Sequence, residues 1–409
     1  MKKLFFFVLV AICVCACSKN NILKNNFVRV EGVNLIDSNG NKLFIKGTNL
    51  GCWLNPEGYM FGFGVASSAR LIDEMFCELV GPERTAEFWK TFKDNYVTRS
   101  DIEYISSCGA NTIRIPFNYR LFTDEDYMGL TSAQDGFARI DSVVKWCSEF
   151  GLYVILDMHA APGGQTGDNI DDSYGYPWLF ESKACQELFY DIWTRIADHY
   201  KNNPVVLGYE LMNEPIAPYF DNQDFLNEKF IPICKEAVAR IRKVDSNHII
   251  LLGAPQWNTN FKPVTDWNFD SNMMLTCHRY GGEASVEGIR DYIEFRDKTG
   301  LPMYMGEIGH NTMEWQSTYS KILQENNIGY TYWPYKKREI ECMVAFEVPE
   351  IWDKIITPFA NNKRGDFNEI RVARPNQENA YKAMMELAEN IRFEHCHPLT
   401  DYINSMMLK

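Results

Sequence analysis

Short apolar runs alternate with longer amphipathic stretches through this 409-residue chain, and that alternation limits its possible folds more than any other feature of the sequence. Eight of the runs have the length and composition of buried strands, and most are separated by a stretch with helical periodicity. They cover residues 43–51, 111–117, 152–159, 205–214, 248–254, 273–280, 302–309 and 328–335. Continuous apolar strands are typical of a parallel sheet with helices over its outer face. Eight such strand–helix units predict a (β/α)8 barrel of the α/β class.

The helical stretches end at residues that commonly end helices, which supports this division. Gly109 and Gly151 each follow an amphipathic stretch, and another such stretch stops at Asn203-Pro204. Residues 351–362 and 376–391 have the pattern of closing helices after the last strand. The chain has no internal repeat and no low-complexity segment, so residues 27–409 are expected to form one domain.

The balance of charges argues against one class of partner. With 41 Lys and Arg residues against 54 Asp and Glu residues, the formal net charge is -13 and the sequence pI is about 5.1. Nucleic acids are polyanions that basic surfaces bind, so an acidic chain argues against a nucleic-acid partner. Hydrophobic residues make up 46% of the chain, which is ample for a large buried core. This composition fits a soluble enzyme that acts on neutral substrates.

The first 17 residues have the pattern of an export signal. Lys2 and Lys3 precede the apolar run "LFFFVLVAICVCAC", which is too short to span a bilayer after processing. Its end, "VCAC", resembles a bacterial lipobox, in which Cys17 is lipidated and becomes the new N-terminus. Residues 1–17 are therefore predicted to be a lipoprotein signal peptide and residues 18–26 a linker, with a plain secretory signal as the alternative. Lipidation would attach the protein to a bacterial membrane through Cys17 alone, on the periplasmic or cell-surface side.

The cysteines do not form a recognisable framework. The chain has 12, of which three belong to the signal, and the other nine are scattered without a CxxC pair. The missing pair argues against a zinc ribbon. Most of the nine occur in apolar periodic segments, for example Cys108, Cys147 and Cys234. We expect buried free thiols rather than disulfides.

Polar residues recur where the predicted strands end. In a (β/α)8 barrel the carboxyl ends of all strands meet on one face, and that face holds the active site. A single polar residue at a strand end is usually a structural group, but several such ends in one fold predict a functional site. The residues concerned are Arg114, His159, Asn213, Glu214, His278, Tyr280, Glu307 and Trp333.

Several of these positions lie in motifs that resemble glycoside hydrolase family 5, the cellulase-type clan. The motifs are "RIPFNY", "DMHAAPGGQTG", "NEP", "HRY", "GEIG" and "YTYWPY", and the likeness covers roughly residues 40–340. "GTNLGCWLNPE" and "DMHAAPGGQTGDNIDDS" are most similar to the exo-β-1,3-glucanase branch of that family. The resemblance implies a barrel with catalytic glutamates on strands four and seven. Glu214 then corresponds to the general acid/base and Glu307 to the nucleophile, with no metal and no cofactor.

The chemistry of glycoside cleavage requires two carboxyl groups in different states. A glycosidic oxygen is a poor leaving group, so one carboxyl group must donate a proton to it. The other must meet the oxocarbenium-like centre from the opposite face of the sugar, and in a retaining enzyme the two groups lie only about 5–5.5 Å apart. Their surroundings must therefore separate their two pKa values.

The resemblance also assigns supporting roles to the remaining residues. Arg114 corresponds to an arginine that keeps the nucleophile ionised and oriented. Asn213 is placed to bond the sugar 2-hydroxyl. His278 and Tyr280 alternate along strand six, so both are expected to point at the nucleophile.

Two further residues are expected to contact the sugar directly. His159 ends the third predicted strand, although an isolated histidine is more often a satisfied core residue. Trp333 resembles the aromatic floor on which the C–H face of the reacting sugar stacks. Aromatic residues in the loops are candidate platforms at the rim of the site, and packing inside the protein is an equal alternative for them. These are Trp53, Tyr174, Tyr176, Trp178 and Trp257.

The insertion "GDNIDDSYGYPW" follows the third predicted strand and is expected to shape the substrate pocket. If residues 164–178 close one end of the cleft, the enzyme acts on chain ends, and if they lie flat, it acts within chains. Asp168, Asp171 and Asp172 are a weaker candidate for Ca²⁺, because the regular EF-hand spacing is absent.

Three functions remain open from the sequence. A retaining β-glycosidase that acts on a β-glucan from its chain end is favoured. The same mechanism could instead serve a mannan, a galactofuranoside or an arabinofuranoside. A non-catalytic glycan-binding lipoprotein would be expected to have lost one carboxylate, whereas both Glu214 and Glu307 are present.

The signal generates a direct prediction. Mass spectrometry of the N-terminal peptide from the native host should find Cys17 as the first residue, carrying two or three acyl chains. Cys17→Ala should leave the precursor unprocessed at this site. A mature chain that starts at Ser18 or later would contradict lipidation and favour the plain secretory signal.

Overall fold

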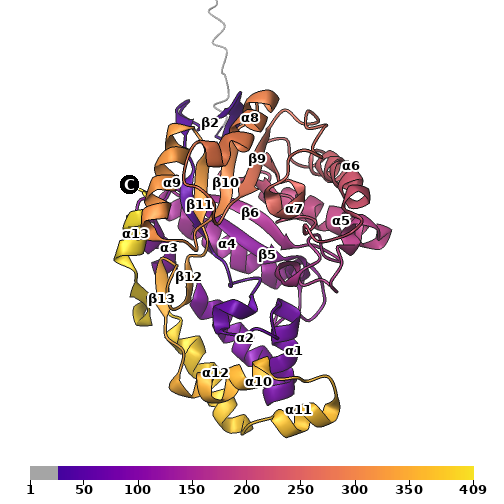
Figure 1. Cartoon of the computed structure of the whole chain (residues 1–409), viewed down its shortest axis with the longest axis vertical. Helices are drawn as coiled ribbons and strands as arrows, with labels where there is room; N and C mark the ends of the chain where they lie inside the picture. Colours follow the sequence, from indigo (N-terminus) through magenta and orange to yellow (C-terminus); the bar gives the residue numbers. More distant parts are fainter. Residues whose placement is uncertain (1–25) are drawn as a thin grey trace, which may run out of the picture.

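The computed structural model describes residues 26–409, and its centre is a closed barrel of eight parallel strands (Figure 1). Going around the barrel, the order is β10-β11-β4-β5-β6-β7-β8-β9, so each strand pairs with its neighbours in sequence. This confirms the predicted (β/α)8 barrel. The strands are Lys46–Asn49 (β4), Thr112–Asn118 (β5), Tyr153–Ala160 (β6), Val206–Glu210 (β7), Ile249–Leu252 (β8), Met273–His278 (β9), Met303–Ile308 (β10) and Gly329–Tyr332 (β11).

Several strands end earlier than the sequence predicted. β7 ends at Glu210, so Asn213 and Glu214 lie in the following loop and Pro215 does not terminate the strand. Glu214 and Ile216 have φ angles of 43° and 56°, in the left-handed region, which turns the chain out of the sheet. β9 likewise ends at His278, so Tyr280 lies beyond it. The predicted first strand is divided between β3 (Lys42–Leu43) and β4.

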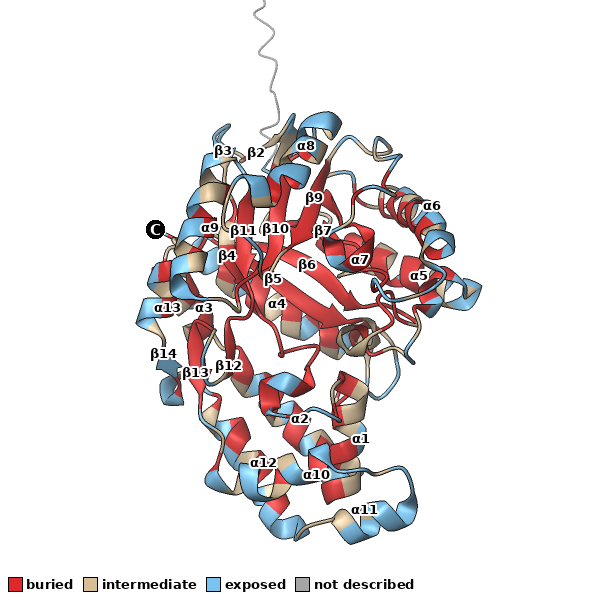
Figure 2. Ribbon diagram, in the orientation of Figure 1, coloured by how far each residue is buried: buried red, intermediate tan, exposed pale blue. Residues whose placement is uncertain are grey.

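Helices cover the outer face of the barrel, and the buried residues of both layers form one core (Figure 2). The predicted helix ends are confirmed, since Gly151 adopts a left-handed φ of 72° and donates its N–H to the carbonyl of Cys147. The outer helices are Arg99–Ser107 (α3), Ala133–Phe150 (α4), Lys183–Tyr200 (α5), Gln223–Ile241 (α6), Arg290–Thr299 (α8), Met313–Glu325 (α9) and Thr400–Ser405 (α13).

A small antiparallel sheet lies at the amino-terminal end of the barrel strands. It consists of β1 (Arg29–Glu31), β2 (Asn34–Ile36) and β3, and its order is β1-β2-β3. Val28 and Leu35 pack there against Ile155 and Leu207 from inside the barrel. The sheet therefore covers the end of the barrel opposite to the carboxyl ends of the strands.

The predicted closing helices do not close the barrel but form a helical layer beside it (Figure 1). An aromatic cluster holds the layer together, and in it the rings of Phe63 and Trp352 stack at 5.7 Å. The N-terminal segment of this layer leads directly from the loop at Glu57 and Tyr59. The layer contains Ala69–Val80 (α1), Pro82–Tyr96 (α2), Thr357–Asn361 (α10), Phe367–Ala373 (α11), Gln377–Asn390 (α12) and the short strands Lys336–Arg338 (β12), Val344–Phe346 (β13) and His397–Pro398 (β14).

The cysteine prediction is confirmed for the described part of the chain. All nine cysteines between residues 26 and 409 are free thiols, and most of them are buried. Cys17 lies outside the described residues, as do the predicted signal peptide and most of the linker. Within residues 26–409, no helix combines the length and apolar character needed to cross a membrane.

Candidate active site

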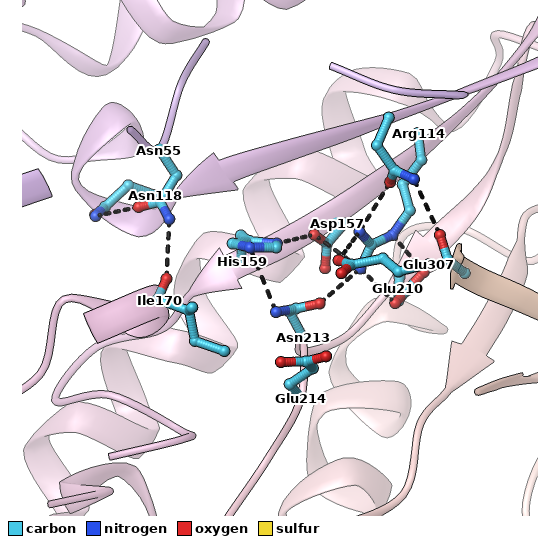
Figure 3. Close-up of polar contacts among 12 residues, drawn as sticks. Asn55, Arg114, Asn118, Asp157, His159, Ile170, Glu210, Asn213, Glu214 and Glu307 are labelled. Atoms are coloured by element: carbon cyan, nitrogen blue, oxygen red, sulfur yellow. Dashed lines mark hydrogen bonds and ion pairs between the residues drawn. The ribbon is translucent and has the colours of Figure 1, made fainter. Parts of the chain in front are cut away.

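A single buried guanidinium organises the carboxyl end of the barrel (Figure 3). Arg114 extends from β5, and its Nη1 donates a hydrogen bond of 2.7 Å to Oε1 of Glu307 on β10. Its Nε and Nη2 donate to the two carboxylate oxygens of Glu210 on β7, at 3.1 and 2.8 Å. Asp157 on β6 lies 3.0 Å from Nη2. Charge-assisted, two-pronged bonds of this kind fix both the direction and the ionisation of the carboxylates.

Two asparagine amides complete the shell around this guanidinium. Arg114 donates to Oδ1 of Asn49 at 3.0 Å and to Oδ1 of Asn213 at 2.9 Å. Because Oδ1 of Asn213 is used in this way, its Nδ2 is directed towards Nε2 of His159, at 3.4 Å. The amide of Asn213 is therefore held in one orientation, with its N–H groups available on the side of the pocket.

His159 carries the second positive charge of the site. Its Nδ1 lies 2.8 Å from Oδ2 of Asp157, and its ring stacks on Trp333 with the planes 5° apart and the centroids at 5.2 Å. Burial alone would lower the pKa of His159, but the Asp157 carboxylate outweighs it and raises the pKa to about 10. Two cations thus stand among the three buried carboxylates of Asp157, Glu210 and Glu307.

Glu307 is held in the ionised state. Oε2 accepts a hydrogen bond of 2.5 Å from the hydroxyl of Tyr280, while Oε1 receives Arg114. Burial would raise the pKa of the carboxyl group, but the neighbouring positive charges, that of His278 in its protonated form and that of Arg114, lower it to about 2. The Tyr280 contact with the predicted nucleophile is therefore present.

Glu214 experiences the opposite environment. It has no arginine partner, and its Oε1 lies 2.8 Å from Nδ1 of His278. Burial raises the pKa of the Glu214 carboxyl group, and the negative charge of Glu307 adds to this. His278 therefore bonds Glu214 rather than Glu307, whose Oε2 is 3.6 Å away. The sequence expectation that His278 serves the nucleophile needs this correction, because the left-handed turn at Glu214 brings that carboxyl group in front of the ring.

The two carboxyl groups are close to each other. One oxygen from each, together with a ring nitrogen of His278, lie within 4.8 Å of one another. Among residues 26–409 this is the trio whose donor atoms could together hold a metal ion. Their contacts are accounted for by the hydrogen bonds from His278, Tyr280 and Arg114, and the guanidinium beside Glu307 opposes a second cation. The two carboxyl groups thus lie close together and have pKa values shifted in opposite directions.

These groups line a pocket of about 380 Å³. Most of the predicted site residues face it, whereas Arg114 and His278 stand behind its wall. The Trp333 ring is fixed by a hydrogen bond of 2.7 Å from its Nε1 to the hydroxyl of Tyr59. The lining residues are Glu57, Tyr59, His159, Ile170, Asn213, Glu214, Tyr280, Glu307, His310 and Trp333.

Sequence reasoning missed part of this lining. Glu57 and Tyr59 come from a loop before the helical layer, and His310 follows β10 after a left-handed turn. Burial raises the pKa of the Glu57 carboxyl group, and His159 lies 3.8 Å from it. Asp157 and Glu210 were also missed, although charged residues inside apolar strand runs were a usable signal because a barrel interior seldom holds them unpaired.

The insertion after β6 is tied firmly to the site. Oδ2 of Asp171 accepts the backbone N–H groups of Thr166 and Gly167, at 2.6 and 2.8 Å. Asp172 forms an ion pair of 2.6 Å with Arg120. These bonds occupy the acidic side chains that were weak candidates for Ca²⁺.

The same insertion contacts the loop that carries Glu214. Gln165 donates to the carbonyl of Asn213 at 2.7 Å, and the Thr166 hydroxyl donates to the carbonyl of Glu214 at 2.8 Å. On the other side, Asn55 donates to the carbonyl of Ile170 at 2.9 Å (Figure 3). Ile170 thereby forms part of the pocket wall.

The candidate rim aromatics divide into two groups. Trp53 is only 2% exposed and donates its Nε1–H to the carbonyl of Lys93, so it is a core residue and not a platform. Tyr174, Trp178 and Trp257 are exposed, and Tyr176 is partly buried against Phe220.

Comparison with known proteins identifies relatives. The profile of the cellulase family, glycosyl hydrolase family 5, matches residues 77–339. A β-xylosidase of Phanerodontia chrysosporium is 32% identical over 305 residues, which are 69% of this chain and only 61% of that relative. Endoglucanase C of Acetivibrio thermocellus is 27% identical over 317 residues, covering 62% of this chain and 88% of the relative.

A solved structure has the same fold. The β-glucanase SdGluc5_26A from Saccharophagus degradans superposes with a TM-score of 0.53 at 18% identity, covering 88% of this chain and 94% of that structure. At this identity the likeness concerns the fold alone.

The different environments of Glu214 and Glu307 predict that their substitution has opposite effects on the free energy of unfolding. A carboxyl group whose folded pKa lies below its unfolded value contributes stability above the unfolded pKa, and this is lost as the pH falls through the folded pKa. Glu307→Gln should therefore lose on the order of 3 kcal/mol at neutral pH, and the loss should shrink from about pH 4.5 towards pH 2. Glu214→Gln should stabilise the protein at neutral pH, because a raised pKa makes the ionised buried carboxylate unfavourable there.

Denaturant titrations of both variants and the wild type at several pH values measure these differences. Glu325→Gln, at an exposed position of α9, is the matched control and should change little. Equal destabilisation by both site variants at neutral pH would contradict the split.

Proposed function

The chain belongs to glycosyl hydrolase family 5, and on this premise we propose that it is a retaining β-glycosidase in which Glu214 is the acid/base and Glu307 the nucleophile. The observation that carries the proposal is the close pair of carboxyl groups with opposite pKa shifts. Their spacing agrees with that of retaining enzymes, whereas inverting enzymes need about 6.5–9.5 Å for a water molecule between the groups.

The proposed reaction begins with a protonated Glu214 and an ionised Glu307. Glu307 attacks the anomeric carbon, while Glu214 transfers its proton to the departing glycosidic oxygen. The Glu307–sugar ester is then cleaved by water, from which Glu214 removes a proton, so the configuration of the anomeric carbon is retained. Arg114 and Tyr280 hold the attacking oxygens in place before the reaction and receive no proton.

The remaining pocket residues are proposed to hold the sugar. Asn213 presents its amide N–H to the 2-hydroxyl, and Trp333 supplies the stacking face. The cation of His159 and the carboxyl group of Glu57 stand side by side, so they can donate to and accept from neighbouring hydroxyls.

We further propose that the substrate is a β-glucan cleaved from its chain end. The anchored insertion supports this, because Ile170 forms part of the pocket wall and Asn55 fixes it from the opposite side. A pocket of about 380 Å³ is also at the small end of ligand sites. The named relatives include both a β-xylosidase and an endoglucanase, so xylosides, mannans, galactofuranosides and arabinofuranosides remain alternative substrates.

The complete site speaks against a non-catalytic glycan-binding protein. Such a protein has no need for a buried network that lowers the pKa of one carboxyl group and raises that of its neighbour. Attachment to a membrane through Cys17 remains our proposal for localisation. β1 enters at the end of the barrel opposite to the site, so a tether there would leave the pocket facing away from the membrane.

The mechanism predicts that the two glutamates separate in rescue experiments. Glu307→Gly should lose hydrolysis, and azide with an activated aryl β-glycoside should restore turnover to an α-glycosyl azide. Glu214→Ala should still cleave activated aryl glycosides and fail on natural ones, because a good leaving group needs no proton. With azide it should yield the β-glycosyl azide. NMR of the products assigns the anomers, and the reverse pattern, or an inverted sugar from the wild type, would refute the assignment.

The pocket predicts the order in which products appear. Digestion of a long β-glucan should release one small sugar from the start, with little early change in viscosity, because an end-on pocket excludes internal segments. Reducing sugars, oligosaccharides and viscosity are followed together. An early fall in viscosity with mixed oligomers would reject the chain-end mode. Activity on furanosides, mannosides or xylosides but on no β-glucan would contradict the proposed β-glucan substrate. The proposed retaining mechanism would not be affected by that result.

A further inference from the structure

Three consecutive non-glycine residues after β8 share an unusual backbone conformation. Gln256, Trp257 and Asn258 have φ angles of 54°, 60° and 58°, in the left-handed region that side chains with a Cβ seldom adopt. They are the last three residues of the short segment Pro255–Asn258 (α7), which follows β8. The N–H of Gln256 donates to the carbonyl of Ile216 at 2.9 Å, which links the segment to the loop of Glu214. Strain of this kind persists where the surroundings impose it, commonly at functional sites.

The strained turn brings the side chain of Asn258 inward against His278. Asn258 is fully buried, and its Nδ2 lies 3.3 Å from Nε2 of His278. Its other amide atom, Oδ1, accepts the backbone N–H of Ala254 at 3.1 Å. Because a backbone N–H can only donate, Oδ1 must be the atom on that side. The amide NH₂ therefore faces the imidazole.

Two glycines leave room for this contact. A Cβ on Gly253 would lie 2.2 Å from Oδ1 of Asn258, and a Cβ on Gly306 would lie 3.0 Å from Nε2 of His278. Side chains at these positions would displace the amide or the ring. The backbone at Gly253, just after β8, and at Gly306, in β10, therefore lies close against Asn258 and His278.

An amide donor at Nε2 decides where the proton of His278 resides. Nε2 of His159 also has an amide neighbour, but it faces the Glu57 carboxyl group at 3.8 Å, which favours a proton there. Nε2 of His278 has the Asn258 amide as its hydrogen-bond partner, so it accepts, and the ring proton is on Nδ1, from which it is donated to Oε1 of Glu214 at 2.8 Å. An imidazolium would place an N–H against the NH₂ of Asn258. The charged groups that shift the pKa of the His278 ring are Glu214, Glu307 and Arg114. His159 and Tyr280 instead shift the pKa values of the two carboxyl groups.

These charges and the amide act in opposite directions. Burial lowers the pKa of His278, but the carboxylates of Glu307 and Glu214 outweigh burial, so this pKa lies above its ordinary value while both carboxyl groups are ionised. The proposed reaction starts with a protonated Glu214. In that state Glu214 has no negative charge, so it no longer raises the pKa of His278. The amide contact remains in both states of Glu214.

We propose that Asn258 is a positioning residue that keeps His278 as the neutral Nδ1–H tautomer and so prevents a positive charge beside Glu214. A neutral donor orients Glu214 without removing its proton, whereas an adjacent cation would favour the carboxylate. The inference rests on the proposed acid/base role of Glu214 and adds the residue that protects it. Asn258 itself does not touch the reacting atoms.

The first test reads the tautomer in the wild type and needs neither a variant nor activity. ¹⁵N-histidine NMR distinguishes an Nδ1–H ring, an Nε2–H ring and an imidazolium, and the chain has only seven histidines to assign. The expected result near neutral pH is the Nδ1–H form of His278, which His278→Gln identifies by the loss of its signals. An imidazolium or an Nε2–H ring would overturn the proposal while leaving the assignment of Glu214 and Glu307 intact.

The second test changes the donor into an acceptor of the same shape. In Asn258→Asp a carboxylate accepts from Nε2–H, so His278 becomes an imidazolium and the pKa of Glu214 falls. The alkaline limb of the kcat/KM profile should move down by about one pH unit, which is about a tenfold loss on that limb, while the acid limb stays in place. Asn260→Asp makes the same change of charge two residues later, away from His278, and should keep the wild-type profile.

The outcomes separate the two proposals. An Asn258→Asp profile equal to that of the wild type would refute the positioning role, as would an equal shift in Asn260→Asp. If Asn258→Asp does not fold, the NMR result in the wild type still decides. Wild-type activity of the Glu214 and Glu307 variants on natural glycosides would instead refute the proposed function, whatever the tautomer of His278.

Discussion

The ion pair between Arg114 and Glu307 is the interaction on which the site depends. A guanidinium buried at the centre of a barrel is costly unless carboxylates surround it, and Glu210 and Asp157 satisfy that requirement together with Glu307. Once this network is in place, Glu307 can remain ionised although it is almost fully buried. The ion pairs at the centre of the barrel thereby keep one of the two carboxyl groups, that of Glu307, ionised.

Glu214 is different because it stands outside this network. Its loop leaves β7 through left-handed residues, which places its carboxyl group against His278 and out of reach of Arg114. Two carboxyl groups a few ångströms apart thus receive opposite electrostatic environments from one fold. The insertion after β6 holds the Glu214 loop through hydrogen bonds from Gln165 and Thr166, so the pocket wall and the Glu214 loop are joined.

Much of the fold and of the site could be predicted from local patterns. Period and length in the apolar runs indicate eight strands, and Glu214, Glu307 and Arg114 occur in motifs next to those strands. Glu57 and Tyr59 could not be found in this way, because their loop lies far in sequence from the strand ends around the pocket. His310 follows the end of β10, where the strand-end pattern could have indicated it. Trp53 was indistinguishable from an exposed loop aromatic until its burial was known.

The sequence alone determined that this chain forms a parallel barrel and that acidic, basic and aromatic side chains gather at the carboxyl ends of its strands. The alternation of apolar runs is a local property of the sequence. In a barrel, the strands formed by these runs all place their carboxyl ends on one face. Only the tertiary structure decided which histidine partners which glutamate and which amide faces His278. Those pairings depend on where the strands end, on left-handed turns and on the orientation of buried side chains. These features arise from contacts between segments far apart in the chain, so a residue's neighbours in sequence do not reveal them.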